Sequence, residues 1–396
     1  MRKIGATYIF TGIQPPIKNG ILTVYDDGTI LEIDSQKNLT EQHGLEYYSG
    51  ILVPGFVNAH CHLELSQLEG KIEEKTGIGG FVGQINKLRN LDFGDTEKIM
   101  HLADRKMWAA GISVVGDISN SALSIKPKLK SRIFYHTFIE SFGFHPSRAE
   151  RAFDYALFVQ QQFTNRNLQS SVVPHSPYSV SQPLFEKIAQ NAVEENSLVC
   201  MHNQESEGEA EFFTSGTGEI ASHISENLGI DTSHWKPTGQ SSLVSVLKYL
   251  PAKNPLLLVH NTFTTQADID VLLQQRNREN TFFVLCPNSN LYIENQLPPV
   301  EMFRQNNLNV CLGTDSLASN HQLSVLAEMI TLQENFPGIH LEELVNWACF
   351  NGARALQVEN RFGSFEPGKK PGVNLISGID FKNMKFTKIS KVKRLI

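Results

Sequence analysis

The chain has 396 residues, 35 of them basic and 41 acidic, which gives a formal net charge of −6. At about 150 residues per domain this length suggests two or three domains, although an α/β barrel often runs longer as one unit. The excess of acidic residues argues against a nucleic-acid binder that relies on a general positive field. It does not exclude a local basic groove. From this charge balance we expect no nucleic acid as a partner. No apolar run of about 18 residues occurs, so we expect no membrane partner either.

The five cysteines lie far apart in the sequence, and no CxxC pair occurs. An odd number of isolated cysteines does not suit a disulfide framework or a cysteine zinc cluster. The first residues carry charges but no apolar stretch long enough for a secretion signal. We therefore expect a reduced, cytoplasmic location.

The first fifty residues alternate apolar and polar side chains and are broken by Gly, Pro and an Asp-Asp-Gly turn at 26–28. This pattern is typical of short strands and hairpins. Another strand is predicted at 372–377, after a polar, Gly-rich passage. Because a single late strand needs a partner, we predict a small β-sandwich domain formed by residues 1–53 and 365–396 together.

From residue 56 onward, short apolar runs alternate with longer helical stretches. We predict strands at 56–60, 112–115, 132–139, 171–175, 198–202, 256–260, 282–286 and 310–313. We predict helices at 96–110, 148–162, 182–196, 241–249, 265–275 and 323–335. Eight strands alternating with helices are typical of an α/β fold, the closed (β/α)8 barrel of the TIM type. We expect this barrel to span residues 54–364.

Several predicted strands end in a side chain that can bind a metal or move a proton. They are His60 and His62 on the first strand, His175 on the fourth, His202 with Glu205 on the fifth, His260 on the sixth and Asp315 after the eighth. In such a barrel the carboxyl ends of all strands meet on one face, where active sites are built. Residues two apart on a strand point the same way, so His60 and His62 can reach one ion. Imidazole and carboxylate ligands suit zinc or iron.

Each of these residues alone has a plainer interpretation. A lone histidine is more often packed or capping, and Asp315 could be a turn residue or the N-cap of the following segment. The joint placement of such residues at the ends of strands one, five, six and eight favours a shared metal site. The sequence contains no HExxH, PCxxC, GxSxG or Walker A motif, which excludes several other enzyme classes. The Gly-rich stretch at 76–83 is predicted to be a mobile loop over the site.

The motifs VPGFVNAHCHLE, HNQE, VHNTF, LGTDSLASN and GSFEPGKK resemble those of the amidohydrolase superfamily, in its branch of metal-dependent deaminases and chlorohydrolases. The likeness covers residues 52–372, although EPGKKPGVNL replaces the usual EPGKKAD ending. The resemblance implies one divalent ion, zinc in first place and iron as the alternative, bound by His60, His62, His202 and Asp315. A strand-four lysine that would bridge a second ion is not recognisable, which favours one metal.

The resemblance also implies roles in catalysis. His260 matches the histidine that hydrogen-bonds the attacking water, and His175 matches one that lines the substrate pocket. Glu205 matches the glutamate that shuttles protons, and it alone in its acidic stretch has the HxxE spacing. Water activated at the metal would attack the carbon of a C(NH2)=N unit, with Glu205 or Asp315 accepting its proton before ammonia leaves.

The stretch HLELS at 62–66 resembles HLEFS of deaminases that act on aminodeoxyfutalosine, an adenine-containing compound. We therefore expect hydrolytic deamination of an aminated purine nucleoside or related heterocycle. Hydrolysis of an amide or a carbon–halogen bond is the alternative, followed by a non-catalytic barrel with a binding role. Glu64 either holds ribose hydroxyls or fixes a ligand imidazole. Phe81, Phe144 and Tyr178 either stack on a base or belong to the core, and a homodimer is usual in this family.

Overall fold

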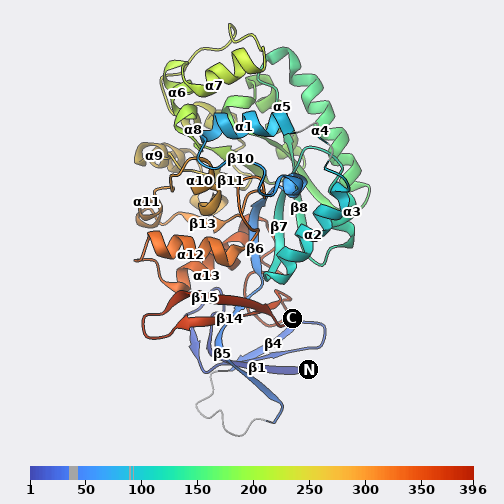
Figure 1. Cartoon of the computed structure of the whole chain (residues 1–396), viewed down its shortest axis with the longest axis vertical. Helices are drawn as coiled ribbons and strands as arrows, with labels where there is room; N and C mark the ends of the chain where they lie inside the picture. Colours follow the sequence, from blue (N-terminus) through green and yellow to red (C-terminus); the bar gives the residue numbers. More distant parts are fainter. Residues whose placement is uncertain (35–42, 89–90, 92) are drawn as a thin grey trace.

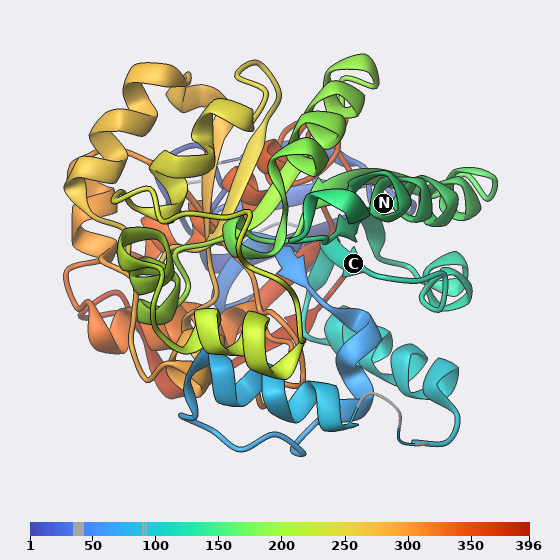
Figure 2. The same cartoon turned by 90° about the horizontal axis from the view of Figure 1, so that it is seen from above.

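The protein is described by a computed structural model that covers residues 1–34, 43–88, 91 and 93–396. Eight parallel strands form two four-stranded sheets, β6-β7-β8-β9 and β10-β11-β12-β13. Seen from above, they lie inside a ring of helices (Figure 2). The strands are β6 (Phe56–Cys61), β7 (Ile112–Ser119), β8 (Phe134–Ser141), β9 (Gln169–Pro174), β10 (Val199–Asn203), β11 (Leu256–His260), β12 (Thr281–Leu285) and β13 (Asn309–Leu312).

Contacts at two seams join the sheets into one barrel. At the first seam the backbone amide of His202 on β10 donates a hydrogen bond to the carbonyl of His175, just after β9, at 2.9 Å. At the second seam Cys61 on β6 and Asp315 after β13 form a parallel bridge. The predicted (β/α)8 barrel is confirmed, and every strand lies where the sequence places it.

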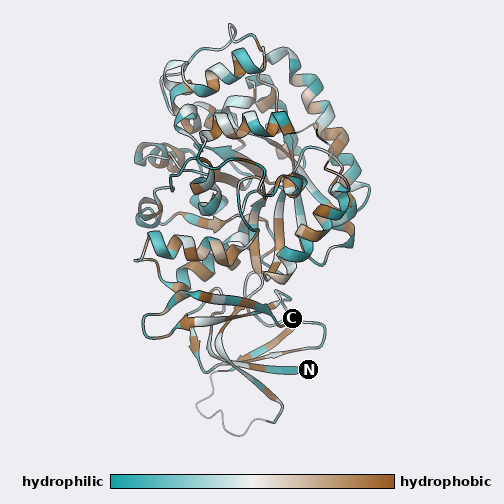
Figure 3. Cartoon of the chain, viewed as in Figure 1, coloured by the Kyte–Doolittle hydropathy of each residue, from teal (hydrophilic) through white to brown (hydrophobic). Residues whose placement is uncertain are grey.

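The barrel strands are buried along nearly their whole length. Every residue of β6, β7, β10, β11 and β12 is buried. Parallel strands covered on both faces read as continuous apolar runs, which is why they stand out in the sequence. The surrounding helices mix hydrophilic and hydrophobic residues (Figure 3), because one side of each helix faces the strands and the other faces solvent.

All six predicted helices are present, as α2, α4, α5, α8 with η5, α9 and α12. The α-helices of the described residues are α1 (Gly77–Leu88), α2 (Thr96–Ala109), α3 (Ile125–Lys130), α4 (Ala149–Thr164), α5 (Gln182–Glu194), α6 (Glu207–Ser215), α7 (Glu219–Ser222), α8 (Ser242–Val246), α9 (Gln266–Gln275), α10 (Pro287–Ile293), α11 (Val300–Gln305), α12 (Val325–Asn335), α13 (Leu341–Asn346) and α14 (Gly352–Ala355). Short 3-10 or π turns are η1 (Leu63–Leu68), η2 (Pro146–Arg148), η3 (Pro177–Ser179), η4 (His223–Asn227), η5 (Leu247–Tyr249), η6 (Arg278–Asn280) and η7 (Trp347–Asn351).

The prediction of a mobile loop at 76–83 is wrong, because helix α1 begins at Gly77. Glycine disfavours a helix by about 1 kcal/mol per residue relative to alanine, and this helix contains four of them. Two contacts outweigh that tendency. Ile78 and Phe81 are buried in the core, and the amide of Ile78 donates to the carboxylate of Glu294 at 2.7 Å. Tertiary packing therefore forms a helix that local propensity disfavours.

Strands from both chain ends pair in one seven-stranded sheet, with the order β15-β14-β5-β1-β3-β4 and β2 paired to β1. They are β1 (Arg2–Ile9), β2 (Ile17–Lys18), β3 (Ile21–Val24), β4 (Ile30–Asp34), β5 (Leu45–Pro54), β14 (Val373–Asp380) and β15 (Lys385–Arg394). The late strand β14 pairs antiparallel with β5, as predicted, whereas β15 is an additional strand. The Asp-Asp-Gly turn connects β3 and β4, and Gly28 has a φ of 85°. The domain boundaries at 53/54 and 364/365 stay predictions.

This sheet attaches to the amino ends of the barrel strands. The side chain of Asn374 donates to the carbonyl of Gly111 at 2.8 Å, and Arg394 donates to the hydroxyl of Ser113 at 2.9 Å. Gly111 and Ser113 lie at the start of β7. The carboxyl ends of the strands therefore open at the opposite end of the molecule (Figure 1). Among the described residues, none of the helices is both long and apolar enough to cross a membrane.

A buried ion pair joins β7 to α3. Nζ of Lys128 lies 2.6 Å from Oδ2 of Asp117, and neither side chain is exposed to solvent. The ammonium also donates to the hydroxyls of Ser119 and Thr137, at 3.2 and 2.9 Å. The other oxygen of Asp117 accepts the amide of Leu63 at 2.8 Å. A pair with this many hydrogen bonds is costly to break, because the remaining charge stays buried.

We expect Lys128→Met to lower the free energy of unfolding by about 3–5 kcal/mol, since it leaves Asp117 without its counter-charge. Denaturant titration measures the change. Lys126→Met is the matched control, because that lysine is exposed and pairs with Glu97 at the surface, where such pairs contribute little. Equal losses of stability in the two variants would contradict a special role for the buried pair.

Candidate metal centre and catalytic site

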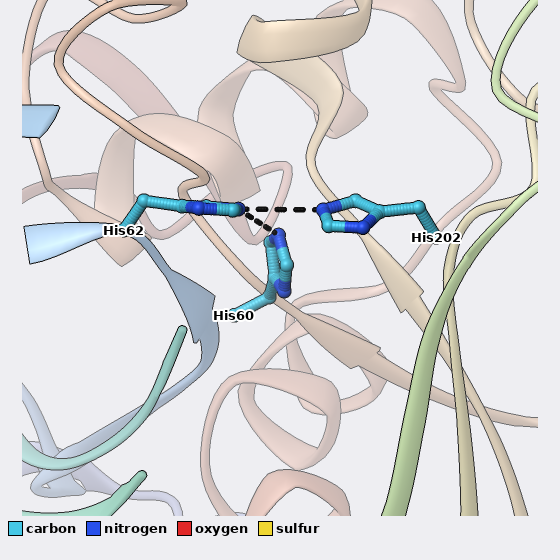
Figure 4. A group of neighbouring side chains, drawn as sticks. All are labelled: His60, His62 and His202. Carbon is cyan, nitrogen blue, oxygen red and sulfur yellow. Dashed lines mark hydrogen bonds between the residues drawn. The ribbon is translucent and has the colours of Figure 1, made fainter. Parts of the chain in front are cut away.

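Three histidines and one aspartate meet at the carboxyl ends of the barrel strands. Nε2 of His62 lies 3.1 Å from Nε2 of His60 and 3.3 Å from Nε2 of His202 (Figure 4). Oδ1 of Asp315 lies 3.3 Å from Nε2 of His62 and 3.6 Å from Nε2 of His60. The fold thus brings together four residues that the sequence separates by up to 255 positions, from His60 to Asp315.

The local backbone explains this placement. His60 lies on β6 and His62 directly follows the last residue of that strand, so the two-residue spacing turns both rings to one face. His202 lies on β10, and its side chain points at the same place from the other half of the barrel. Asp315 follows β13 with a φ of 56°, which is uncommon for a residue other than glycine and recurs at functional sites.

Burial sets the protonation of the histidines and hydrogen bonding sets that of the aspartate. Burial lowers the pKa of His60 and holds the pKa of His62 well below its ordinary value. For Asp315, burial opposes ionisation, but the hydrogen bond with His60 and the other facing histidines hold the pKa of the carboxyl well below its usual range. His60 and His62 are therefore neutral imidazoles with a lone pair to offer, and they face an ionised carboxylate.

The two oxygens of Asp315 have different surroundings. Oδ2 accepts hydrogen bonds from the hydroxyls of Ser289 and Ser319, each at 2.6 Å. Oδ1 is the atom that faces the imidazoles. The serines thus fix the carboxylate so that one oxygen remains directed at the ring nitrogens.

This donor set fits a divalent cation. Neutral imidazole nitrogens at these distances present lone pairs to one another, which is unfavourable unless a shared proton or cation lies between them. Three ring nitrogens and one carboxylate oxygen are ligands that zinc and iron accept. His60, His62 and His202 each offer one ligand atom within 4.8 Å of the others.

Glu205 and His260 lie beside this cluster as a pair. Nε2 of His260 is 3.4 Å from Oε1 of Glu205, and both side chains are almost completely buried. Burial raises the pKa of Glu205 well above its ordinary value, and the charges of Asp315 and Glu294 add to that effect. Burial also holds the pKa of His260 well below its ordinary value. The pair can therefore hold a proton on the carboxyl next to a neutral imidazole.

The acidic stretch around Glu205 divides into distinct roles. The carboxylate of Glu209 accepts the backbone amides of Gln204 and Glu205, at 3.0 and 3.3 Å, and so fixes the segment that carries Glu205. Glu207 and Glu211 are exposed. Within this stretch, Glu205 is the carboxylate that contacts His260.

His175 and Glu64 lie at the edge of the site. The ring of His175 is 4.9 Å from that of His202, and its Nδ1 contacts the hydroxyl of Ser179 at 2.8 Å. The two oxygens of Glu64 accept the amide of Asn120 at 3.0 Å and the hydroxyl of Ser121 at 2.8 Å. Burial raises the pKa of Glu64 to about 7. Glu64 is thus bound to the turn after β7.

Two features of the site are absent from the predictions made on the sequence. Glu140 is the second-last residue of β8 and places Oε1 3.2 Å from Nδ1 of His202. The only signal in the sequence is its position beside the end of a predicted strand. Of the two serines that bind Asp315, Ser289 comes from α10, whereas Ser319 lies four residues after the aspartate, within the motif LGTDSLASN. Of the aromatic candidates, Phe81 and Phe144 belong to the hydrophobic core, and Tyr178 packs against it.

Comparisons with known proteins agree with this geometry. The sequence model of the Amidohydrolase family matches residues 51–395. An adenosine deaminase of Helicobacter pylori is 26% identical over 373 residues, which cover 91% of this chain and 87% of that protein. An aminodeoxyfutalosine deaminase of Nitratiruptor sp. is 25% identical over 372 residues, with coverages of 88% and 85%.

A solved structure has the same fold. It is the aminofutalosine deaminase of Helicobacter pylori in complex with methylthio-coformycin, with a TM-score of 0.82, 22% identity and full coverage of both chains. The matched family region contains every residue of the barrel strands and of the cluster at their carboxyl ends. The chain belongs to the amidohydrolase family.

Proposed function

We propose that this chain is a metal-dependent hydrolase of carbon–nitrogen bonds other than peptide bonds. The reaction we propose is hydrolytic deamination of an aminated purine nucleoside of the adenosine or aminodeoxyfutalosine type. The observation that carries this proposal is the contact between Glu205 and His260 beside four converging metal donors. A site that only bound a metal would not need a buried carboxyl group in contact with a fifth buried side chain, His260, at this place.

His60, His62, His202 and Asp315 would hold one divalent ion, zinc in first place and iron as the alternative. When bound, such an ion supplies Lewis acidity and lowers the pKa of water toward neutrality. The residues themselves set its place, since their donor atoms already face one another. Asp315 contributes Oδ1, while the two serine hydroxyls hold its other oxygen.

Proton transfer is the task of Glu205. Its carboxylate accepts a proton from the attacking water and delivers it to a ring nitrogen of the substrate, which makes the neighbouring carbon more electrophilic. His260 orients the water through Nε2, and Asp315 is the second group that can accept its proton. A further proton on the amino group allows ammonia to leave, so water and an amine become a carbonyl product and ammonia.

The relatives support a purine nucleoside as the substrate. The two similar proteins act, by their names, on adenosine and aminodeoxyfutalosine, and the similar structure holds a coformycin derivative. In our proposal His175 lines the pocket next to His202. Glu64 forms another part of the wall, where its carboxyl group is held by the turn after β7.

We also propose a cytoplasmic location, in line with five cysteines that all carry free, buried thiols. A homodimer is the assembly that we propose. Exposed apolar side chains support it, because Leu123, just before α3, and Tyr155 and Phe158 on α4 are exposed by 60%, 55% and 60%. The two segments are adjacent, since the hydroxyl of Tyr155 donates to the carbonyl of Asn120 at 3.3 Å. Contiguous exposed apolar patches mark interaction surfaces.

We predict one equivalent of divalent metal per chain, and its loss in Asp315→Ala and His60→Ala. Each variant removes a direct donor, so metal affinity should fall by more than the roughly 10–100-fold caused by losing an outer partner. Elemental analysis of the purified proteins gives the stoichiometry. Two equivalents that are both needed for activity would refute the single site, and full occupancy in the Asp315 variant would remove the aspartate from the ligand set.

We predict that Glu205→Gln folds and keeps its metal but loses turnover by at least about 10²–10⁴-fold, the usual contribution of general acid–base catalysis. Glutamine has nearly the same shape and cannot accept the proton. His260→Asn should likewise keep metal and lose rate through poorer orientation of the water. The measurement is ammonia release with adenosine derivatives, after a screen that also includes guanine, cytosine and amides.

Glu207→Gln is the matched control for this comparison, because Glu207 lies two residues away and is exposed. It should release ammonia at the wild-type rate. Near-normal ammonia release by the metal-loaded Glu205 variant would show that the proton shuttle is assigned to the wrong carboxylate. Glu64 would then be the next residue to substitute.

A further inference from the structure

The imidazole of His202 has acceptors at the nitrogen that does not face the other histidines. Its Nδ1 lies 2.9 Å from the backbone carbonyl of His175 and 3.2 Å from Oε1 of Glu140. A carbonyl oxygen only accepts hydrogen bonds, so Nδ1 must carry the proton. Nε2 of His202 then has the free lone pair, and this is the atom that faces His62.

Glu140 is itself held in place. It is the second-last residue of β8. Its side chain is 3% exposed, and its second oxygen accepts a hydrogen bond from the side-chain amide of Asn120 at 3.2 Å. The backbone amide of Asn120 donates to Glu64 at 3.0 Å. Asn120 thus bridges two carboxylates, one beside His202 and one at the edge of the site.

We propose that Glu140 is a positioning residue for metal binding, acting through Nδ1 of His202. This rests on the proposed function, since it concerns the same metal centre. A carboxylate next to the protonated nitrogen of an imidazole fixes the tautomer, restrains the ring and makes the opposite nitrogen a stronger ligand. The carbonyl of His175 fixes only the tautomer. Burial raises the pKa of Glu140, whereas His202 and the hydrogen bond from Asn120 lower it. Because N–H groups lie at both of its oxygens, the geometry favours the carboxylate form of Glu140.

A different role for Glu140 has to be separated from this one. Glu140, His175 and His202 also offer ligand atoms within 4.8 Å of one another, which is the pattern of a second metal site. Since the carbonyl of His175 already takes the proton on Nδ1 of His202, that nitrogen would have to lose a proton to bind an ion. The hydrogen bond therefore favours the positioning role.

The test is the zinc affinity of the full chain, measured by competition with a chelator of known affinity. Glu140→Gln keeps the shape and the bond to Asn120 but removes the charge, and Glu140→Leu removes both. We expect zinc affinity to fall by about 10-fold in the first variant and about 100-fold in the second, the range found for outer partners of metal ligands. The melting temperature of the metal-free proteins should stay unchanged in Glu140→Gln.

Asp104→Asn is the matched control. Asp104 is also a buried carboxylate, but it accepts hydrogen bonds from Ser131 and Tyr135 and lies outside the site. Its substitution should leave zinc affinity at the wild-type value. If Asp104→Asn lost as much zinc affinity as Glu140→Gln, the loss would come from a general destabilisation of the fold on removing a buried carboxylate. That result would overturn the proposal.

Four further outcomes are decisive. Wild-type zinc affinity in Glu140→Gln would overturn the positioning role, and a fall from two zinc ions to one would show that Glu140 is itself a ligand.

If Glu140→Gln does not fold, Asn120→Ala decides, because it frees the carboxylate while keeping the backbone bond to Glu64. We expect it to bind zinc several-fold more weakly, and unchanged affinity would refute the proposal. A wild-type chain that binds no zinc would instead refute the proposed function.

Discussion

The close approach of three imidazoles and one carboxylate is the constraint on which the rest of this structure depends. Nε2 atoms only 3.1 and 3.3 Å apart, together with a buried carboxylate, do not assemble by themselves in the absence of a cation. Rigid strands have to bring the groups there. The barrel does so because the carboxyl ends of its strands converge, while the seven-stranded sheet covers only the opposite end.

Around this centre, His62, His202 and Asp315 are each restrained by a partner at their other polar atom or in the adjoining backbone. Two serines hold the second oxygen of Asp315, and the carbonyl of His175 holds the second nitrogen of His202. The chain directly after His62 is held by Asp117, which accepts the amide of Leu63. Restraint of this kind lowers the entropic cost of ordering these side chains when an ion or a substrate binds.

The sequence predicts some parts of this arrangement well because they depend on local pattern. Buried parallel strands appear as apolar runs, and the HxH spacing follows from the two-residue repeat of a strand. Helix α1 could not be predicted, since the contacts of Ile78, Phe81 and Glu294 override the glycines. Glu140 is equally hidden in the sequence. Only the folded barrel brings its side chain on β8 to His202 on β10, across the intervening strand β9, and nothing in its own segment distinguishes it from a solvated carboxylate.

The division of the barrel into two four-stranded sheets has a thermodynamic consequence. His60 and His62 belong to the first sheet, whereas His202 belongs to the second and Asp315 follows its last strand. An ion held by all four would cross-link the two halves of the barrel across both seams. Because the unfolded chain cannot assemble these donors, ion binding and folding are linked, and each tenfold rise in free ion above the dissociation constant adds about 1.4 kcal/mol to the stability of the whole barrel.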